Sequence, residues 1–179
     1  MANNAKKYII TAITLGVIAA ASAGIIGLTN LLTAKQIAAN EQKRFNAGIV
    51  AIFGENASVD TNYKNEGSGQ YVQEWYWVHM GEGVESNYIF KTTGSNMYGK
   101  ISLLVGFDSS KVFKETYTLV NEQTYASTLV ENYLVPLNGG DRELDDVSCG
   151  ATYGAKLVRS MAEEASTWAK DNLGQGGNN

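Results

Sequence analysis

The sequence predicts an α+β protein, in which an N-terminal transmembrane helix is followed by one mainly antiparallel sheet domain with flanking helices. Three observations support this class. A run of 25 residues near the N-terminus carries no charge, segments rich in aromatic and β-branched residues occupy the middle of the chain, and helical periodicity dominates its last part.

The composition excludes several classes of function. The 179 residues carry a formal net charge of −4, so a broad basic surface for nucleic acid is not expected. A single cysteine excludes an internal disulfide and any zinc or iron–sulfur site built from cysteines. A single histidine, His79, leaves little room for a histidine metal site or a Ser-His-Asp triad. We therefore predict no metal site and no catalytic residues.

Residues 1–34 are expected to form a membrane anchor. The uncharged run, Tyr8–Leu32, would reach roughly 37 Å as a helix, which is enough to cross a hydrocarbon core of ~30 Å with some tilt. Lys6 and Lys7 precede the run, although Lys35 and further basic residues follow it. The positive-inside rule favours a single-pass protein of the cell membrane, with a cytoplasmic N-terminus and an extracytoplasmic C-terminal domain.

A cleaved signal peptide is the alternative interpretation of this run. The small residues Ala21–Ala23, "ASA", resemble a cleavage site that follows an apolar core. The apolar run continues from Gly24 to Leu32, which a cleaved signal would not need. The sequence favours an uncleaved anchor and leaves cleavage open.

The rest of the chain divides into an extracytoplasmic domain, residues 35–172, and a polar, glycine-rich tail, residues 173–179, that is expected to be disordered. The domain is expected to begin with a helix that leaves the membrane and docks on it. Apolar residues recur in that segment at roughly helical spacing: Ile37, Ala38, Phe45, Ile49, Ile52 and Phe53. Residues 54–58 then interrupt the helical pattern.

Four segments are predicted to be strands. They are rich in aromatic and β-branched residues or have a continuous apolar centre, and they cover residues 70–80, 87–94, 99–108 and 112–120. A polar, glycine-containing loop over residues 62–70 precedes them. The last two strands are joined by the short turn "SSK", so we expect them to pair antiparallel.

Two helices are expected after the strands. A short one begins within residues 121–127 and ends before Pro136, since proline disfavours a helical residue before it. A loop over residues 138–146 follows. The strongest helix of the domain starts at Thr152, and one face of it carries Leu157, Val158, Met161, Ala162, Ala165, Trp168 and Ala169.

The residues at the start of that helix have the composition of an anion site. Gly150 and Ala151 have minimal side chains, so a ligand or an enzyme could approach the backbone closely. Thr152 offers a hydroxyl where free N–H groups and the helix dipole favour an anion. Asp145 and Asp146, just upstream, could bind a cation or cap the loop. This arrangement indicates a phosphate site, and the alternative is that Thr152 is an ordinary capping residue.

The run Asp146–Thr152 resembles the flavinylation motif of a family of FMN-binding domains. The family includes RnfG, a component of the Rnf complex, and the corresponding component of the Na+-translocating NADH:quinone reductase. Its motif is Asp, two variable residues, Ser or Thr, then Gly-Ala-Thr. The chain has Asp-Val-Ser-Cys-Gly-Ala-Thr, with Cys149 where the family usually has a hydroxyl residue. The resemblance implies that Thr152 carries FMN through a phosphoester, installed from FAD by a separate flavin transferase. It also implies that Asp146 serves recognition during the transfer.

Two further segments resemble blocks of this family. Residues 94–108 are similar to its block of glycine, tyrosine-glycine and a strand ending in Val-Gly-Ile-Asp. Residues 121–127 lie where the family often has Glu-Thr-Pro-Gly-Leu-Gly, a loop that commonly flanks the flavin. The cofactor-binding residues that the resemblance implies are Thr152, Ala151, Gly150, Cys149, Asp146, Glu122, Thr124 and Tyr98.

Several of these side chains have a second interpretation. Cys149 is either a reactive thiol or a small replacement for serine, and Glu122 either shapes the pocket or caps the following helix. The aromatic run Trp75–Trp77 either includes a residue that stacks on the flavin or belongs to an ordinary strand. His79 lies in the same run and is more often structural than catalytic.

The resemblance implies a membrane-anchored flavoprotein that transfers electrons through FMN on Thr152. It would act as the electron-transfer subunit of an oxidoreductase complex in the membrane, rather than as a stand-alone enzyme. Its partners would be a flavin transferase and other membrane redox subunits, with no nucleic acid. The alternative is a flavin-free structural or accessory membrane protein that retains the FMN-binding fold, which Cys149 and the altered loop at Gln123 motivate.

Overall fold

A computed structural model describes residues 2–59, 65–67, 69–81 and 87–173 of the chain. It divides into two compact units, Met1–Lys43 and Arg44–Asn179. Parts of the loop expected over residues 62–70, and residues 174–179 of the expected tail, lie outside the described residues. Leu173, the first residue of that expected tail, is buried against the core.

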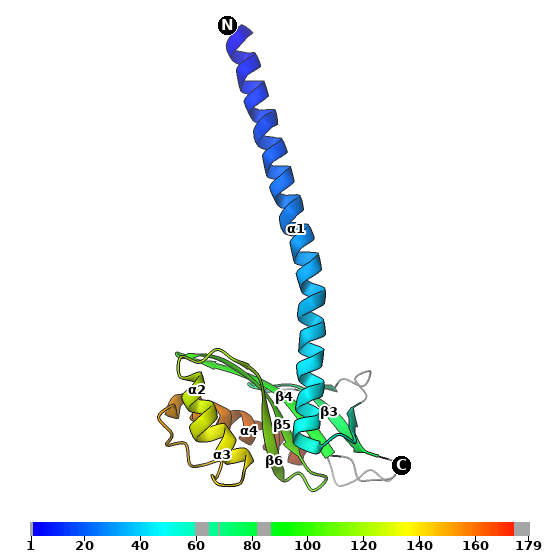
Figure 1. Cartoon of the computed structure of the whole chain (residues 1–179), viewed down its shortest axis with the longest axis vertical. Helices are drawn as coiled ribbons and strands as arrows, with labels where there is room; N and C mark the ends of the chain where they lie inside the picture. The colour runs from blue at the N-terminus through cyan, green and yellow to red at the C-terminus, as the bar shows by residue number, and fades with distance from the viewer. Residues whose placement is uncertain (1, 60–64, 68, 82–86, 174–179) are drawn as a thin grey trace. The chain divides into compact units, whose positions relative to one another are not determined.

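Helix α1, Ala2–Phe53, is continuous (Figure 1). From Lys6 to Lys43 every side chain is exposed, including large apolar ones such as Leu15. The threonines of this segment satisfy their hydroxyl groups within the helix: Thr11 and Thr29, for example, each donate to the carbonyl four residues earlier, at 3.0 and 2.8 Å. In the part of the chain that the structure describes, this is the one helix long and apolar enough to cross a membrane.

The sheet of the second unit is antiparallel throughout and confirms the α+β class. Its strands follow the order β1-β3-β4-β5-β6, and the short β2 pairs with β3. Figure 1 labels the four longer strands, β3 to β6. All four predicted strands are present, and the one expected over 87–94 extends further. The bounds are β1 Ala57–Val59, β2 Asn65–Glu66, β3 Val72–Met80, β4 Asn87–Asn96, β5 Gly99–Phe107 and β6 Phe113–Asn121.

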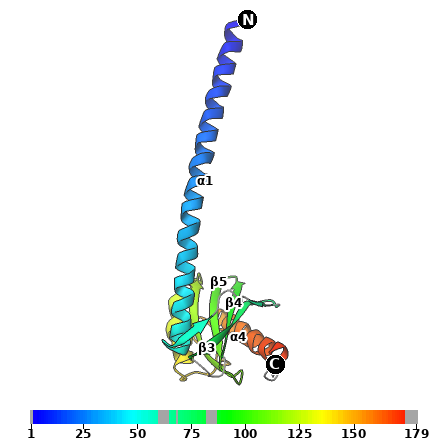
Figure 2. The same ribbon diagram turned by 90° about the vertical axis from the view of Figure 1, so that its right-hand side faces the viewer.

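Helix α4, Thr152–Asn172, packs on one face of the sheet, as Figure 2 shows. Its buried face matches the predicted one: Leu157, Val158, Met161, Ala162, Ala165 and Ala169 are buried, with Trp168 half-buried beside them. They contact the sheet residues Phe90, Leu103 and Val105 in a single apolar cluster. The helical period of the sequence therefore identified the core side of this helix.

The expectation that the preceding helix ends before Pro136 is wrong. Helix α2, Ala126–Leu129, continues through a π-helical turn, η1 Val130–Leu134, into α3, Val135–Asn138. Proline in a regular α-helix lacks a donor and its ring clashes with the carbonyl four residues before. A π-helical turn is wider than an α-helical one, which gives the chain room to pass the proline without ending the helix.

The end of α1 packs on the opposite face of the sheet. Phe45, Ile49, Ile52 and Phe53 are buried there, whereas Ile37, grouped with them by its spacing, is exposed. A side chain at Gly106 of β5 would overlap Ile52, so the helix approaches the strand closely at a glycine. The docking part of the predicted helix is thus restricted to its last turns.

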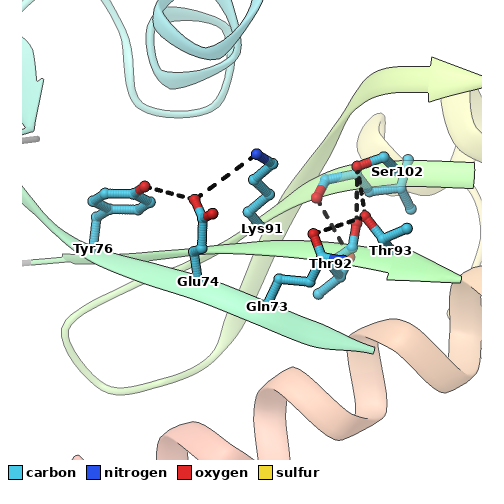
Figure 3. Close-up of polar contacts among 8 residues, drawn as sticks. Gln73, Glu74, Tyr76, Lys91, Thr92, Thr93 and Ser102 are labelled. Carbon is cyan, nitrogen blue, oxygen red and sulfur yellow. Dashed lines mark hydrogen bonds and ion pairs between the residues drawn. The ribbon is translucent and has the colours of Figure 1, made fainter. Parts of the chain in front are cut away.

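The same sheet face also carries a polar network (Figure 3). Glu74 accepts a hydrogen bond of 2.7 Å from the Tyr76 hydroxyl and lies 3.8 Å from the Lys91 ammonium. Burial, and then the bond to Glu74, raise the pKa of Tyr76 above its ordinary value, so the hydroxyl remains a donor. Beside them the Thr93 hydroxyl lies 2.9 Å from that of Ser102. This face is therefore apolar under the end of α1 and polar elsewhere.

Candidate functional site

The first turn of α4 carries no side-chain cap. The capping position is Ala151, with φ −114° and ψ 42°, and its carbonyl accepts the first helical bond from Ala155 N at 3.0 Å. Thr152 is the first helical residue and is half-buried. The interpretation of Thr152 as the capping residue is therefore wrong, because the cap falls one residue earlier, on a side chain that cannot accept a hydrogen bond.

Gly150 turns the chain into this helix. Its φ of +82° lies in the left-handed region, which other residues adopt only with strain. An added Cβ would lie 3.3 Å from the Thr128 methyl carbon, so the loop also passes close to α2 at this point. Glycine is thus required here by the backbone, independently of any ligand.

A pocket of about 260 Å³ opens at the start of α4. It brings together the β4–β5 turn, the segment between β6 and α2, and the first residues of α4. The residues that line it are Tyr98, Gln123, Tyr125, Leu129, Gly150, Ala151, Thr152, Tyr153 and Gly154. Four of the residues that the sequence singled out, Tyr98 and Gly150–Thr152, therefore lie in one pocket.

Gln123 links the three segments. Its side chain is buried, and its amide group donates to the Gly99 carbonyl and, at 3.1 Å, to the Asn96 side chain. Asn96 in turn donates to the Tyr153 carbonyl in the first turn of α4, at 3.1 Å. In the sequence Gln123 stands out only as part of an altered loop, whereas in the structure it is the residue that fixes the pocket wall.

Glu122 and Thr124, which flank Gln123, are not among the residues that line this pocket. Their backbone N–H groups donate to the carbonyls of Lys100 and Tyr98, each at 2.8 Å, and so extend the pairing of β5 and β6. The Thr124 hydroxyl also donates to the Tyr98 carbonyl, at 3.2 Å. Gln123 and Tyr125, by contrast, line the pocket, and the chain turns there: the Ala126 N–H donates to the Gln123 carbonyl at 3.1 Å.

Two arginines fix the loop that leads to Thr152. Arg142 donates to the carbonyl of Asp146 at 2.7 Å and lies 3.2 Å from its carboxylate. Arg159, on α4, lies 2.8 Å from the carboxylate of Asp145. Both carboxylates are thus paired with arginines, and the Asp146 side chain is still 58% exposed, which leaves it accessible to a partner.

Cys149 faces away from the pocket, into the core. It is buried in the cluster beneath α4, and its carbonyl accepts a hydrogen bond of 3.2 Å from the Asn132 side chain. Nearby, the Tyr133 hydroxyl donates to the Leu144 carbonyl at 2.6 Å. Burial, and then the neighbouring Cys149, raise the pKa of Tyr133 above its ordinary value, which keeps that donor in place. The loop is therefore anchored at several points.

The aromatic run in β3 lies elsewhere on the sheet. Trp75 and Tyr76 are buried on opposite faces, and Trp77 is 39% exposed with its ring 4.9 Å from that of Tyr88. His79 is exposed, opposite Ser58 of β1. None of the four lines the pocket at Thr152. Their placement agrees with the interpretation of this run as an ordinary strand.

A comparison with protein-family models relates the N-terminal part of the chain to a known family. The RnfG N-terminal region matches residues 1–52, which is nearly all of α1. No curated protein matches the chain. The match does not extend to the pocket. Together with the long apolar helix, it indicates an RnfG-like, membrane-anchored protein.

Proposed function

We propose that the chain is an electron-transfer subunit of a membrane redox complex and carries FMN on Thr152 through a phosphoester. The observation that carries the proposal is the position of Thr152. Thr152 lines a pocket at the first turn of α4, where no described side chain caps the helix. The RnfG-like N-terminal helix supports an anchored subunit of such a complex.

The residues of the pocket fit a flavin phosphoester. The Thr152 hydroxyl supplies the attachment oxygen, and the first-turn N–H groups of α4, with a helix dipole worth roughly +0.5 charge, favour the phosphate. Gly150 is exposed, and together with the small Ala151 it lines the pocket without a bulky side chain beside the Thr152 hydroxyl. The aromatic rings of Tyr98, Tyr125 and Tyr153 offer contacts for a flat ring system.

Attachment would use FAD and a separate flavin transferase. The Thr152 oxygen forms a bond to the FMN-side phosphorus as the pyrophosphate bond breaks. AMP leaves with the electron pair of that bond, and the hydroxyl proton passes to a base of the transferase. The exposed Asp146 carboxylate, held by Arg142, provides a contact for that enzyme.

Bound FMN supplies reversible electron transfer, and the protein supplies the tether, the orientation and the electrostatics. We propose that the domain faces outward, because Lys6 and Lys7 precede the apolar helix. A covalent link suits that location, since a dissociated cofactor would be lost by dilution. No catalytic residue is required of this chain, because its substrate would be the electron itself.

The attachment is tested on the full chain co-expressed with a flavin transferase. The protein should fluoresce in a denaturing gel and gain the mass of FMN less one water, on the tryptic peptide from Glu143 to Lys156. Thr152→Ala and Thr152→Val should abolish both signals, and Thr152→Ser should keep them. Because Thr152 makes no cap, the valine variant should lose less than about 1 kcal/mol of stability.

The alternative function predicts a different outcome. A structural or accessory protein would carry no covalent flavin when isolated from its native membrane, even with the transferase present. Retention of flavin by the valine variant would instead show that the link lies on another residue. Either result would reject electron transfer through Thr152.

A further inference from the structure

Three tyrosines from three separate segments meet at the pocket. Tyr98 lies in the β4–β5 turn, Tyr125 precedes α2, and Tyr153 lies in the first turn of α4. The ring of Tyr98 is central: its centroid lies 5.9 Å from that of Tyr125 and 5.5 Å from that of Tyr153. We call these three side chains the tyrosine shelf.

The rings of the shelf are only partly covered by one another. The interplanar angles are 58° and 42°, so neither pair is stacked face to face. Tyr125 is 53% exposed and Tyr153 is 59% exposed. Both of these rings therefore keep apolar surface in water, in a cluster that adjoins the residue proposed to carry the flavin.

The backbone beneath the shelf is fixed. The N–H of Tyr98 donates to the Asn96 side chain at 2.8 Å, and its carbonyl accepts from Thr124. Asn96 also holds the Tyr153 carbonyl, so the turn and the helix are linked through one side chain. The positions from which Tyr98 and Tyr153 project are thus set before any ligand binds.

We propose that the tyrosine shelf binds the isoalloxazine ring of the flavin attached to Thr152. This inference rests on the proposed function. The shelf suits a flat aromatic ring, because contact between aromatic rings is favourable and because Tyr153 directly follows the attachment residue. A shallow, exposed surface is enough for a tethered ring, since the tether keeps its effective concentration near the millimolar range.

The ammonium group of Lys156 adds a charge to the same place. It lies 5.9 Å from the centroid of the Tyr153 ring, one turn along α4. A positive charge here favours the electron-rich form of a bound ring over the oxidised form. The shelf would therefore shield one face of the ring from solution, and the nearby charge would bias the ring toward reduction.

Fluorescence provides a direct test. A phenol in contact with an excited flavin donates an electron to it and recovers that electron afterwards, which quenches the emission with no net reaction. Flavinylated full-length protein in detergent should therefore emit weakly, and iodide should quench the remaining emission poorly. In the double variant Tyr125→Leu/Tyr153→Leu, emission per bound flavin and the iodide quenching constant should both rise severalfold.

Substitution of the tyrosines by phenylalanine distinguishes contact of the rings with the flavin from quenching of its emission by the phenols. Tyr125→Phe/Tyr153→Phe keeps the ring contacts but removes two of the three oxidisable phenols, so emission should rise while the iodide quenching constant stays at the wild-type value. Trp77→Leu, which removes a partly exposed aromatic residue outside the pocket, is the control and should change neither. If the leucine variant does not accept flavin, the phenylalanine variant decides.

The outcomes distinguish the two proposals. Wild-type protein without covalent flavin would reject the proposed function itself. Protein with normal flavin content, whose emission and iodide quenching are unchanged in both double variants, would reject the tyrosine shelf alone. A phenylalanine variant that becomes as accessible to iodide as the leucine variant would show that the hydroxyl groups, rather than the rings, hold the flavin.

Discussion

Glu164 ties the helix that begins at Thr152 to the sheet. Its carboxylate accepts three consecutive backbone N–H groups at the start of β3. One oxygen accepts from Tyr71 at 2.7 Å and from Val72 at 2.8 Å, and the other accepts from Gln70 at 3.1 Å. Removing this carboxylate leaves the three donors without their partner, so the mutation should destabilise the domain.

The magnitude follows from the number and burial of these bonds. A hydrogen bond to a charged group contributes about 1.5–3 kcal/mol, but three bonds on one carboxylate are not additive, and the bond to Gln70 is exposed. We expect Glu164→Ala to lower the free energy of unfolding by about 2–4 kcal/mol. Glu164→Gln keeps one acceptor oxygen for Tyr71 and Val72, so its cost should be about 1–2 kcal/mol.

The assay is urea unfolding of the full chain in detergent, followed by tryptophan fluorescence. Trp75 and Trp168 lie in contact in the core beneath α4, with ring centroids 5.4 Å apart, so they report loss of this packing. Glu163 is the matched control, because it pairs with Arg159 on the exposed side of the same helix. Glu163→Ala should cost less than about 1 kcal/mol. Equal effects of the two alanine variants would refute the reasoning.

Two further predictions concern the anchor and the cysteine. Because Lys6 and Lys7 precede the apolar helix, protease added to intact cells should reach the C-terminal tail of the domain. A tail that is protected from the protease and is labelled by cytosolic reagents would contradict an exported domain. Because Cys149 is buried and faces the core, Cys149→Ser and Cys149→Ala should both still accept flavin. The alanine variant should be destabilised by about 1 kcal/mol, because it leaves a small cavity in the core. Flavin content is measured by gel fluorescence, and its loss in both variants would show that the thiol has its own role.

The regular elements could be predicted because their periods depend on local sequence. The buried face of α4 and the centre of β5 were identified from the 3.6-residue period and from a continuous apolar run. The continuation of the helix through Pro136 could not be predicted, because it depends on a π-helical turn that no local propensity encodes. The same limit applies to Ile37, whose spacing matches that of the docking residues although it lies beyond the docked turns.

The pocket wall shows a different limit. A motif comparison assigns residues by their order along the chain, and it selected Glu122 and Thr124. Which side chains enter a pocket depends instead on the register of the backbone pairing. The N–H groups of Glu122 and Thr124 donate to the carbonyls of Lys100 in β5 and Tyr98 in the β4–β5 turn, whereas Gln123 and Tyr125 line the pocket. Register is set by contacts distant in sequence, so the two inward residues could be found only in the structure.

The start of α4 departs from the usual preference for a polar capping residue. Serine, threonine, aspartate or asparagine at the cap would stabilise this helix by about 1 kcal/mol over alanine, yet Ala151 occupies that position. The surrounding residues obey the rules of packing: Cys149 fills the core, and Gly150 supplies the left-handed turn. A capping side chain would occupy the N–H groups that a phosphate on Thr152 would use. When a fold follows the local rules elsewhere but lacks a capping side chain at one helix end, beside an aromatic pocket, that departure is typical of a binding site.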